Sequence, residues 1–189
     1  MNKSQTHVVI VHGTMGSAKE NWFPWLSKEL EALGAKVSIP QLPTPKDQNL
    51  FNWIAEFEKA IGPLTANHIL LGHCVGATFC LRMLERLSSP IKATFLVSTL
   101  LKELVVPGYK QYIESFIEEP FNWAKIERNA GKVGVFHGAD DPYIPLHEAR
   151  QLAQDLHTSL HIIEEGGHLN ASSGFTEFPL LLEMMAKSI

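Results

Sequence analysis

The sequence predicts a three-layer α/β fold in which helices cover both faces of a mostly parallel, six-stranded sheet. Two observations carry this prediction. Six short β-branched runs alternate with longer segments of helical period. Each run is also almost continuously apolar, as strands covered on both faces are. Such alternation is typical of βαβ units with right-handed crossovers, so ligand chemistry is expected at the carboxyl ends of the strands.

The expected elements carry boundary signals of their own. Pro24 lies in the first turn of a helix that Gly34 ends. Asp47 is expected to cap a second helix, whose apolar stripe runs from Leu50 to Ile61. Three further helices are predicted over residues 75–87, 146–156 and 180–187. The predicted strands are 8–12, 36–39, 68–71, 93–98, 133–137 and 160–163.

The connection between the fourth and fifth predicted strands is the longest in the chain. It contains five aromatic residues among several acidic ones. Two interpretations stand side by side: a helical cover over the strand ends, or an amphipathic helix packed on the surface. The aromatic residues are Tyr109, Tyr112, Phe116, Phe121 and Trp123.

Composition and charge exclude several classes of protein. The chain of 189 residues is 45% hydrophobic and 19% charged, which argues for one folded domain over residues 1–189 rather than disorder. A net charge of -4 with scattered Lys and Arg argues against a nucleic-acid or membrane partner. Residues 1–4 lead directly into an apolar strand, which leaves no signal peptide, and no apolar run is long enough to span a bilayer. We therefore expect a cytoplasmic protein.

Cys74 lies in Gly72-His73-Cys74-Val75-Gly76, between an apolar strand and an apolar helix. This small-x-nucleophile-x-small pattern is that of a nucleophile elbow. Gly72 and Gly76 suit it because the nucleophile occupies a strained turn and the following helix approaches the strand closely. A thiol at a helix N-terminus is favoured as thiolate. The competing interpretation is a buried structural cysteine, and no disulfide between Cys74 and Cys80 is expected.

The other groups that a thiol nucleophile needs follow in the order acid, then histidine. The fifth predicted strand leads into Asp140-Asp141-Pro142, where a carboxylate is placed to orient a histidine. Asp141 is the first choice and Asp140 the alternative, while a mere turn-capping role competes for both. His168 follows Gly166-Gly167 after the last strand and is the expected base.

The end of the first predicted strand, His12-Gly13, is placed to support an oxyanion hole. The nominated donors are the backbone N–H groups of Thr14 and Val75. A metal site formed by histidines at the strand ends is the competing arrangement. No compact ligand spacing supports it, so neither a metal nor a cofactor is expected. Its candidate ligands are His12, His73, His137 and His168, with Asp140 or Asp141.

Together these motifs resemble the retinoblastoma-binding protein 9-like, or YdeN-like, family of compact serine hydrolases with the α/β-hydrolase fold. The resemblance covers nearly the whole chain and lies in segments 12–13, 21–26, 72–76, 120–126, 140–145 and 166–170. It implies a hydrolase of small carboxylic esters with little or no lid. Its triad would be Cys74, Asp141 and His168. Neither cysteine lies in a Leu-x-Cys-x-Glu motif, so no protein partner is carried over from the family.

The chain departs from this family in having Cys74 where its members mostly have serine. Dienelactone hydrolase uses a cysteine on the same fold, which is a precedent by analogy for thiol catalysis there. We therefore expect an acyl hydrolase of small esters or thioesters that works through a thioester acyl-enzyme. The alternative is a binding protein on a hydrolase scaffold, weakened or inactivated by a natural or engineered cysteine. Sulfur displaced by about 1 Å from the productive position can cost ~100-fold in rate.

Overall fold

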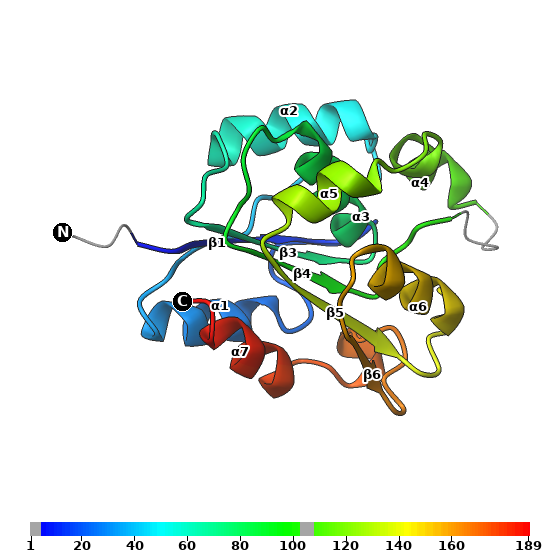
Figure 1. Ribbon diagram of the computed structural model, residues 1–189. Helices are drawn as coiled ribbons and strands as arrows, with labels where there is room; N and C mark the ends of the chain where they lie inside the picture. Colours follow the sequence, from blue (N-terminus) through cyan, green and yellow to red (C-terminus); the bar gives the residue numbers. More distant parts are fainter. Residues whose placement is uncertain (1–4, 103–107) are drawn as a thin grey trace.

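A computed structural model describes residues 5–102 and 108–189 of the protein (Figure 1). Six strands in this part of the chain form a sheet in the order β2-β1-β3-β4-β5-β6, and every neighbouring pair is parallel. The predicted α/β class and six-stranded sheet are confirmed, with each strand within two residues of its expected bounds. The strands are β1 (His7–Val11), β2 (Lys36–Ser38), β3 (His68–His73), β4 (Ala93–Val97), β5 (Lys132–Gly138) and β6 (Leu160–Ile163).

Helices cover both faces of the sheet, as Figure 1 shows. On one face lie α2 (Leu50–Ile61), α3 (Val75–Arg86), α4 (Lys110–Ile117), α5 (Trp123–Asn129) and α6 (Leu146–Asp155). On the other lie α1 (Phe23–Ala32) and α7 (Pro179–Ala186). A short 3₁₀ helix, η1 (Ala171–Ser173), precedes α7. The central strands β3 and β4 are fully buried between the two layers, whereas the edge strands β2 and β6 stay partly exposed.

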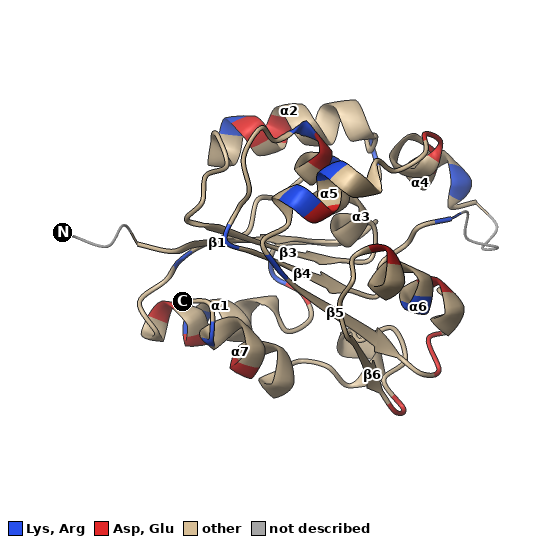
Figure 2. Cartoon of the chain, viewed as in Figure 1, with Lys and Arg blue, Asp and Glu red and all other residues tan. Residues whose placement is uncertain are grey.

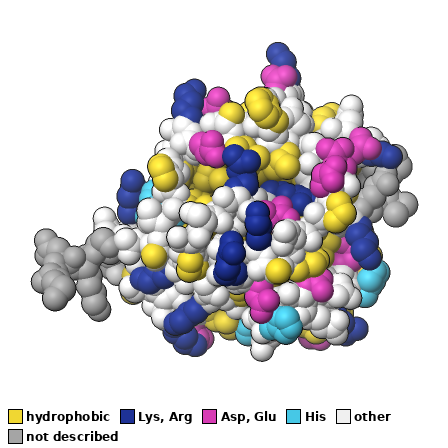
Figure 3. Space-filling model, turned by 45° about the horizontal axis from the view of Figure 1, so that its top comes forward, with side chains coloured by type: hydrophobic (Ala, Val, Ile, Leu, Met, Phe, Trp, Pro, Cys, Tyr) yellow, Lys and Arg dark blue, Asp and Glu magenta, His cyan; other side chains and the backbone are white. Residues whose placement is uncertain are grey.

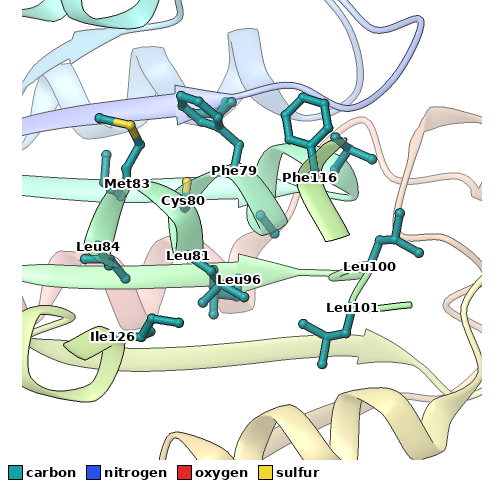
Figure 4. Close-up of a cluster of buried hydrophobic side chains, with 14 of the residues drawn as sticks. Phe79, Cys80, Leu81, Met83, Leu84, Leu96, Leu100, Leu101, Phe116 and Ile126 are labelled. Carbon is teal, nitrogen blue, oxygen red and sulfur yellow. The ribbon is translucent and has the colours of Figure 1, made fainter. Parts of the chain in front are cut away.

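The alternation of side chains along each strand divides the core into two apolar clusters. In β1, Val9 and Val11 contribute to one cluster, whereas Val8 and Ile10 contribute to the other. Helix α3 is buried over most of its length in the first cluster. Figure 4 shows its side chains packed among those of neighbouring elements. The α3 residues labelled there are Phe79, Cys80, Leu81, Met83 and Leu84, with Leu96 of β4 and Phe116 of α4 nearby.

Helices α4 and α5 form the described part of the long connection between β4 and β5. Ile113 and Phe116 are fully buried in the core, so α4 packs as an amphipathic helix. Arg82 of α3 contacts both α4 and the segment that follows α4. Its Nε donates to the Phe116 carbonyl of α4 at 2.8 Å, and its guanidinium carbon lies 3.8 Å from the centre of the Phe121 ring. The packing interpretation of this connection therefore applies to α4.

The cap of α2 differs from the prediction. Asn49, not Asp47, is the N-cap residue, and its Oδ1 accepts a hydrogen bond from the Asn52 N–H at 2.9 Å. Asn49 has an extended backbone and lies directly before the first helical turn, which is the geometry that capping requires. Asp47 lies two residues too early and adopts a left-handed φ of 62°. Its carbonyl instead accepts a hydrogen bond from the Asn52 side chain at 2.8 Å.

Charges of both signs are interspersed over the helices, as Figure 2 shows for α2 and α5. The face that comes forward in Figure 3 carries the same mixture, with small hydrophobic areas between the charged side chains. The surface in these views therefore has no extended region of one charge.

In residues 5–102 and 108–189, no helix has the length and hydropathy needed to cross a membrane.

The Asn49 cap is expected to contribute to the stability of the protein. Asn49→Ala removes the acceptor of the Asn52 N–H and is expected to lower the free energy of unfolding by about 1 kcal/mol. Asp47→Asn keeps a residue that tolerates left-handed backbone and leaves the cap intact, so it is expected to change stability by less than about 0.5 kcal/mol. Urea unfolding of both variants measures the difference, and equal losses would contradict the assignment.

Candidate active site

Cys74 lies in the turn between β3 and α3, with φ 57° and ψ -126°. A left-handed φ is rare for a residue with a Cβ, so the surrounding structure must hold it. Two glycines allow the tight packing that does so. A Cβ on Gly72 would collide with the backbone of Ala77, and one on Gly76 would collide with the Val11 carbonyl at the end of β1. The pentapeptide thus forms the strained strand-to-helix turn that the sequence predicts.

Backbone hydrogen bonds hold Cys74 from both sides. Its N–H donates to the Val97 carbonyl of β4 at 3.0 Å, and its carbonyl accepts from the Ala77 N–H at 3.0 Å. The residue is partly exposed, whereas Cys80 is fully buried and its thiol pKa is raised by that burial. Of the two cysteines, Cys74 is the one that a substrate can reach.

Asp141 is the carboxylate that contacts His168. Its Oδ2 lies 2.8 Å from His168 Nδ1, and its side chain is fully buried. Its Oδ1 accepts hydrogen bonds from the N–H groups of Tyr143 and Ile144, which fix the carboxylate in the turn after β5. Asp140 has a different partner, because its Oδ1 accepts from the Gly167 N–H at 2.8 Å. The two candidate acids are therefore distinguished by geometry.

The ionisation of this pair follows from its surroundings. Burial by itself lowers the pKa of His168, but the Cys74 sulfur and the Asp141 carboxylate outweigh it and raise that pKa to about 10. Burial by itself raises the pKa of Asp141, but the His168 interaction and two backbone N–H donors hold it below its usual value. A hydrogen bond from His168 to Cys74 adds to the effect. The three side chains thus form one electrostatic unit.

The loop that carries His168 is anchored through its backbone. His73 Nε2 lies 2.9 Å from the His168 carbonyl, and Ser98 Oγ donates to the same oxygen at 3.3 Å. Burial lowers the pKa of His73 to about 3, so its ring is neutral and Nε2–H is the donor. Trp22 Nε1 donates to the Leu169 carbonyl at 2.9 Å. These donors fix the loop without contacting the His168 ring nitrogens.

Ser98 and Trp22 were not expected to act at this site. They lie 70 and 147 residues from their acceptors along the chain, so no local pattern connects them to the loop. The sequence does contain a signal for Trp22, since it belongs to one of the tryptophan-containing segments that carry the family resemblance. Tyr143 is a further unexpected neighbour, with its ring edge-on to the His168 ring at 5.0 Å.

The nominated oxyanion donors lie beside Cys74. Gly13 packs against Cys74, since a Cβ on Gly13 would lie 3.1 Å from Cys74 Cβ and 3.7 Å from Sγ. Val75 is the first residue of α3, so its N–H points out of a helix N-terminus. Among the described residues, neither the Thr14 N–H nor the Val75 N–H has a hydrogen-bond acceptor. Both donors are available to a ligand oxygen.

Two further histidines at the strand ends bind backbone carbonyl oxygens. His12 Nδ1 lies 2.8 Å from the Gly13 carbonyl, and His137 Nε2 lies 2.9 Å from the Ile144 carbonyl. His137 Nε2 is also 3.8 Å from Asp141 Oδ2, the oxygen that His168 Nδ1 contacts at 2.8 Å. Within the described part of the chain, no three His, Cys, Asp or Glu residues are grouped so that they could hold a metal ion.

Comparisons with known proteins bear on the family and the fold of the chain. The family model described as serine hydrolase matches residues 8–187. The chain is 31% identical to YdeN of Bacillus subtilis (strain 168), a protein that is named as a hydrolase, over 94% of this chain and 93% of YdeN. It is 27% identical to serine hydrolase RBBP9 of Rattus norvegicus, over 96% of this chain and 95% of that protein. The crystal structure of the YdeN gene product superposes with a TM-score of 0.89 and covers 97% of this chain and 98% of its own.

The raised pKa of His168 leads to a prediction. In the unmodified protein its ring is expected to titrate near pH 10, and in Cys74→Ser the pKa should fall, because a neutral hydroxyl replaces the sulfur. Since the folded pKa exceeds the ordinary 6.5, this group's contribution to stability is full below pH 6.5 and is lost as the pH rises towards 10. Ring C–H chemical shifts, assigned with His168→Gln, follow the titration. An unchanged pKa in Cys74→Ser would contradict the coupling.

Proposed function

The chain belongs to the serine hydrolase family, and from that premise we propose that it is an acyl hydrolase of small carboxylic esters or thioesters. The proposed nucleophile is Cys74, the proposed base is His168 and the proposed acid is Asp141. The observation that carries the proposal is the 2.8 Å contact between Asp141 and His168 on the side of the ring away from the elbow cysteine. This is the arrangement that a nucleophile, a base and an orienting carboxylate require.

In the proposed acylation step, the Cys74 thiolate attacks the carbonyl carbon of the ester. The carbonyl oxygen becomes an oxyanion, which the N–H groups of Thr14 and Val75 stabilise. When the intermediate collapses, the carbon–oxygen bond to the alcohol breaks and His168 gives its proton to the leaving alkoxide. The products are the free alcohol and a thioester between the acyl group and Cys74.

In the proposed deacylation step, water takes the place of the alcohol. His168 accepts a proton from the water as its oxygen attacks the thioester carbonyl, and the same two N–H groups hold the second oxyanion. Collapse breaks the carbon–sulfur bond and releases the carboxylic acid and the Cys74 thiolate. Asp141 keeps the Nδ1 side of the ring bonded throughout, so that Nε2 handles the transferred proton. The cycle consumes only ester and water.

The side chains at the rim of the site favour a small apolar substrate. Met15 directly follows Thr14 and is 51% exposed, and Tyr143 beside His168 is 47% exposed. The Tyr109 hydroxyl lies 3.8 Å from the Met15 sulfur, so an aromatic residue at the start of α4 extends this rim. Exposed apolar side chains beside His168 and next to Thr14 in the chain favour apolar acyl or alcohol groups over charged ones.

A second candidate function is ligand or protein binding without efficient turnover. The observation that favours it is Cys74 itself, because the family to which the chain belongs takes its name from serine. A site shaped for an oxygen nucleophile holds the larger sulfur out of position, and such displacement is costly. The two candidates make opposite predictions for the serine variant.

The decisive experiment is hydrolysis of p-nitrophenyl acetate and butyrate by the unmodified protein and by Cys74→Ser. We expect turnover in the unmodified protein and a loss of about tenfold or more in Cys74→Ser, because the hydroxyl is not ionised by His168. Cys80→Ala, at a buried cysteine outside the site, serves as the control with turnover unchanged. Turnover only in Cys74→Ser would instead establish the binding protein or an engineered inactive form.

The matched pair Asp141→Asn and Asp140→Asn tests the acid in the same assay. Asp141→Asn removes the charge that orients the ring and should lower kcat/KM by about 100-fold or more. Asp140→Asn keeps an oxygen for the Gly167 N–H and should lower it by less than about fivefold. A larger loss of kcat/KM in Asp140→Asn than in Asp141→Asn would instead identify Asp140 as the acid that orients His168.

A further inference from the structure

His12 is fully buried at the end of β1, and its hydrogen bonds define its tautomer. The Leu42 N–H lies 3.0 Å from Nε2. Because a backbone N–H can only donate, Nε2 must be the acceptor and carries no hydrogen. Burial also lowers the pKa of His12, which keeps the ring neutral. The hydrogen of the neutral ring is therefore on Nδ1.

Nδ1–H donates to the Gly13 carbonyl oxygen at 2.8 Å. The same oxygen accepts a hydrogen bond from the Gly16 N–H at 3.1 Å, so two donors hold it. The peptide unit that joins Gly13 to Thr14 is planar, and in a trans peptide the N–H points away from the C=O. Fixing the Gly13 oxygen therefore fixes the direction of the Thr14 N–H.

The rest of this loop is held in the same orientation. The Met15 N–H donates to Thr44 Oγ1 at 2.7 Å, and Gln48 Nε2 donates to Thr14 Oγ1 at 2.8 Å. Gly13 itself lies against Cys74, in the contact described above. The Thr14 N–H, which has no acceptor among the described residues, is thus held beside the proposed nucleophile before any substrate arrives.

We propose that His12 is a positioning residue of the oxyanion hole, which aims the Thr14 N–H at the reacting carbonyl by holding the Gly13 oxygen. The proposal rests on the acyl-hydrolase function proposed above. A donor set in place in advance stabilises the transition state without reorganisation, and removing one costs about 100-fold or more. Since the Gly16 N–H still holds the Gly13 oxygen when His12 is changed, the expected loss is smaller, about 10-fold to 100-fold.

Two substitutions separate the two hydrogen bonds of the ring. In His12→Asn the side-chain amide nitrogen takes the place of Nδ1 and still donates to the Gly13 oxygen, whereas the acceptor for Leu42 is lost. In His12→Gln the longer side chain places an acceptor near the Leu42 N–H, whereas the donor to Gly13 is lost. If His12 only maintains the fold, both variants should lose acylation equally. If His12 positions the Thr14 N–H, His12→Gln should lose more acylation than His12→Asn.

Two rates are measured for each variant: the pre-steady-state release of p-nitrophenol from p-nitrophenyl butyrate, and the alkylation of Cys74 by iodoacetamide. Alkylation needs the thiolate and the fold but forms no oxyanion. We expect His12→Gln to lose about 10-fold to 100-fold in acylation while its alkylation stays within about twofold. His12→Asn should keep acylation within about threefold of the unmodified protein. The exposed residue His157, changed to Gln, is the control and should affect neither rate.

Three results would overturn the proposal. Acylation by His12→Gln at the rate of the unmodified protein would show that the Thr14 N–H needs no such support. Equal losses of both rates in His12→Asn and His12→Gln would show that His12 only maintains the fold. No acylation of the unmodified protein, together with rapid alkylation of Cys74, would refute the acyl-hydrolase function and the proposal with it.

Discussion

The close packing of α3 against the ends of β1 and β3 is the constraint on which the site depends. Without a Cβ at Gly72 and Gly76, the helix begins immediately beside the Val11 carbonyl. That contact forces Cys74 into its left-handed turn and brings it against Gly13. This packing thus places Cys74 beside the loop that carries the proposed oxyanion donor Thr14, and side-chain hydrogen bonds hold that loop. The strain at Cys74 is balanced by the burial of nearly every α3 side chain in the core.

Three histidines show how surroundings give one residue type different roles. Burial lowers the pKa values of His12 and His73, so each ring is neutral and donates to a backbone carbonyl oxygen. His168 is also buried, but it lies between a carboxylate and a sulfur, so its pKa is raised to about 10. Two rings hold backbone oxygens of the site and the third carries charge, which is the division that the proposed acyl transfer requires.

The sequence predicted the sheet well because nearly continuous apolar strands and glycine-bounded turns are local signals. It also placed Cys74, Asp141 and His168 at strand ends, where parallel topology brings such residues to one edge. The cap of α2 was predicted wrongly, because Asp47 and Asn49 are both good capping residues and only the backbone conformation decides between them. The anchoring of His168 by Ser98 and Trp22 could not be predicted, since each contact joins segments far apart in the chain.

The central claim is that the Cys74 sulfur carries the acyl group. Rapid quenching of the reaction with p-nitrophenyl butyrate, followed by peptide mass spectrometry, tests it most directly. The proposed mechanism predicts a butyryl group on the peptide that contains Cys74, released by hydroxylamine at neutral pH as a thioester is, and absent from Cys80. Turnover without an acylated Cys74, or a butyryl group on another side chain, would contradict it.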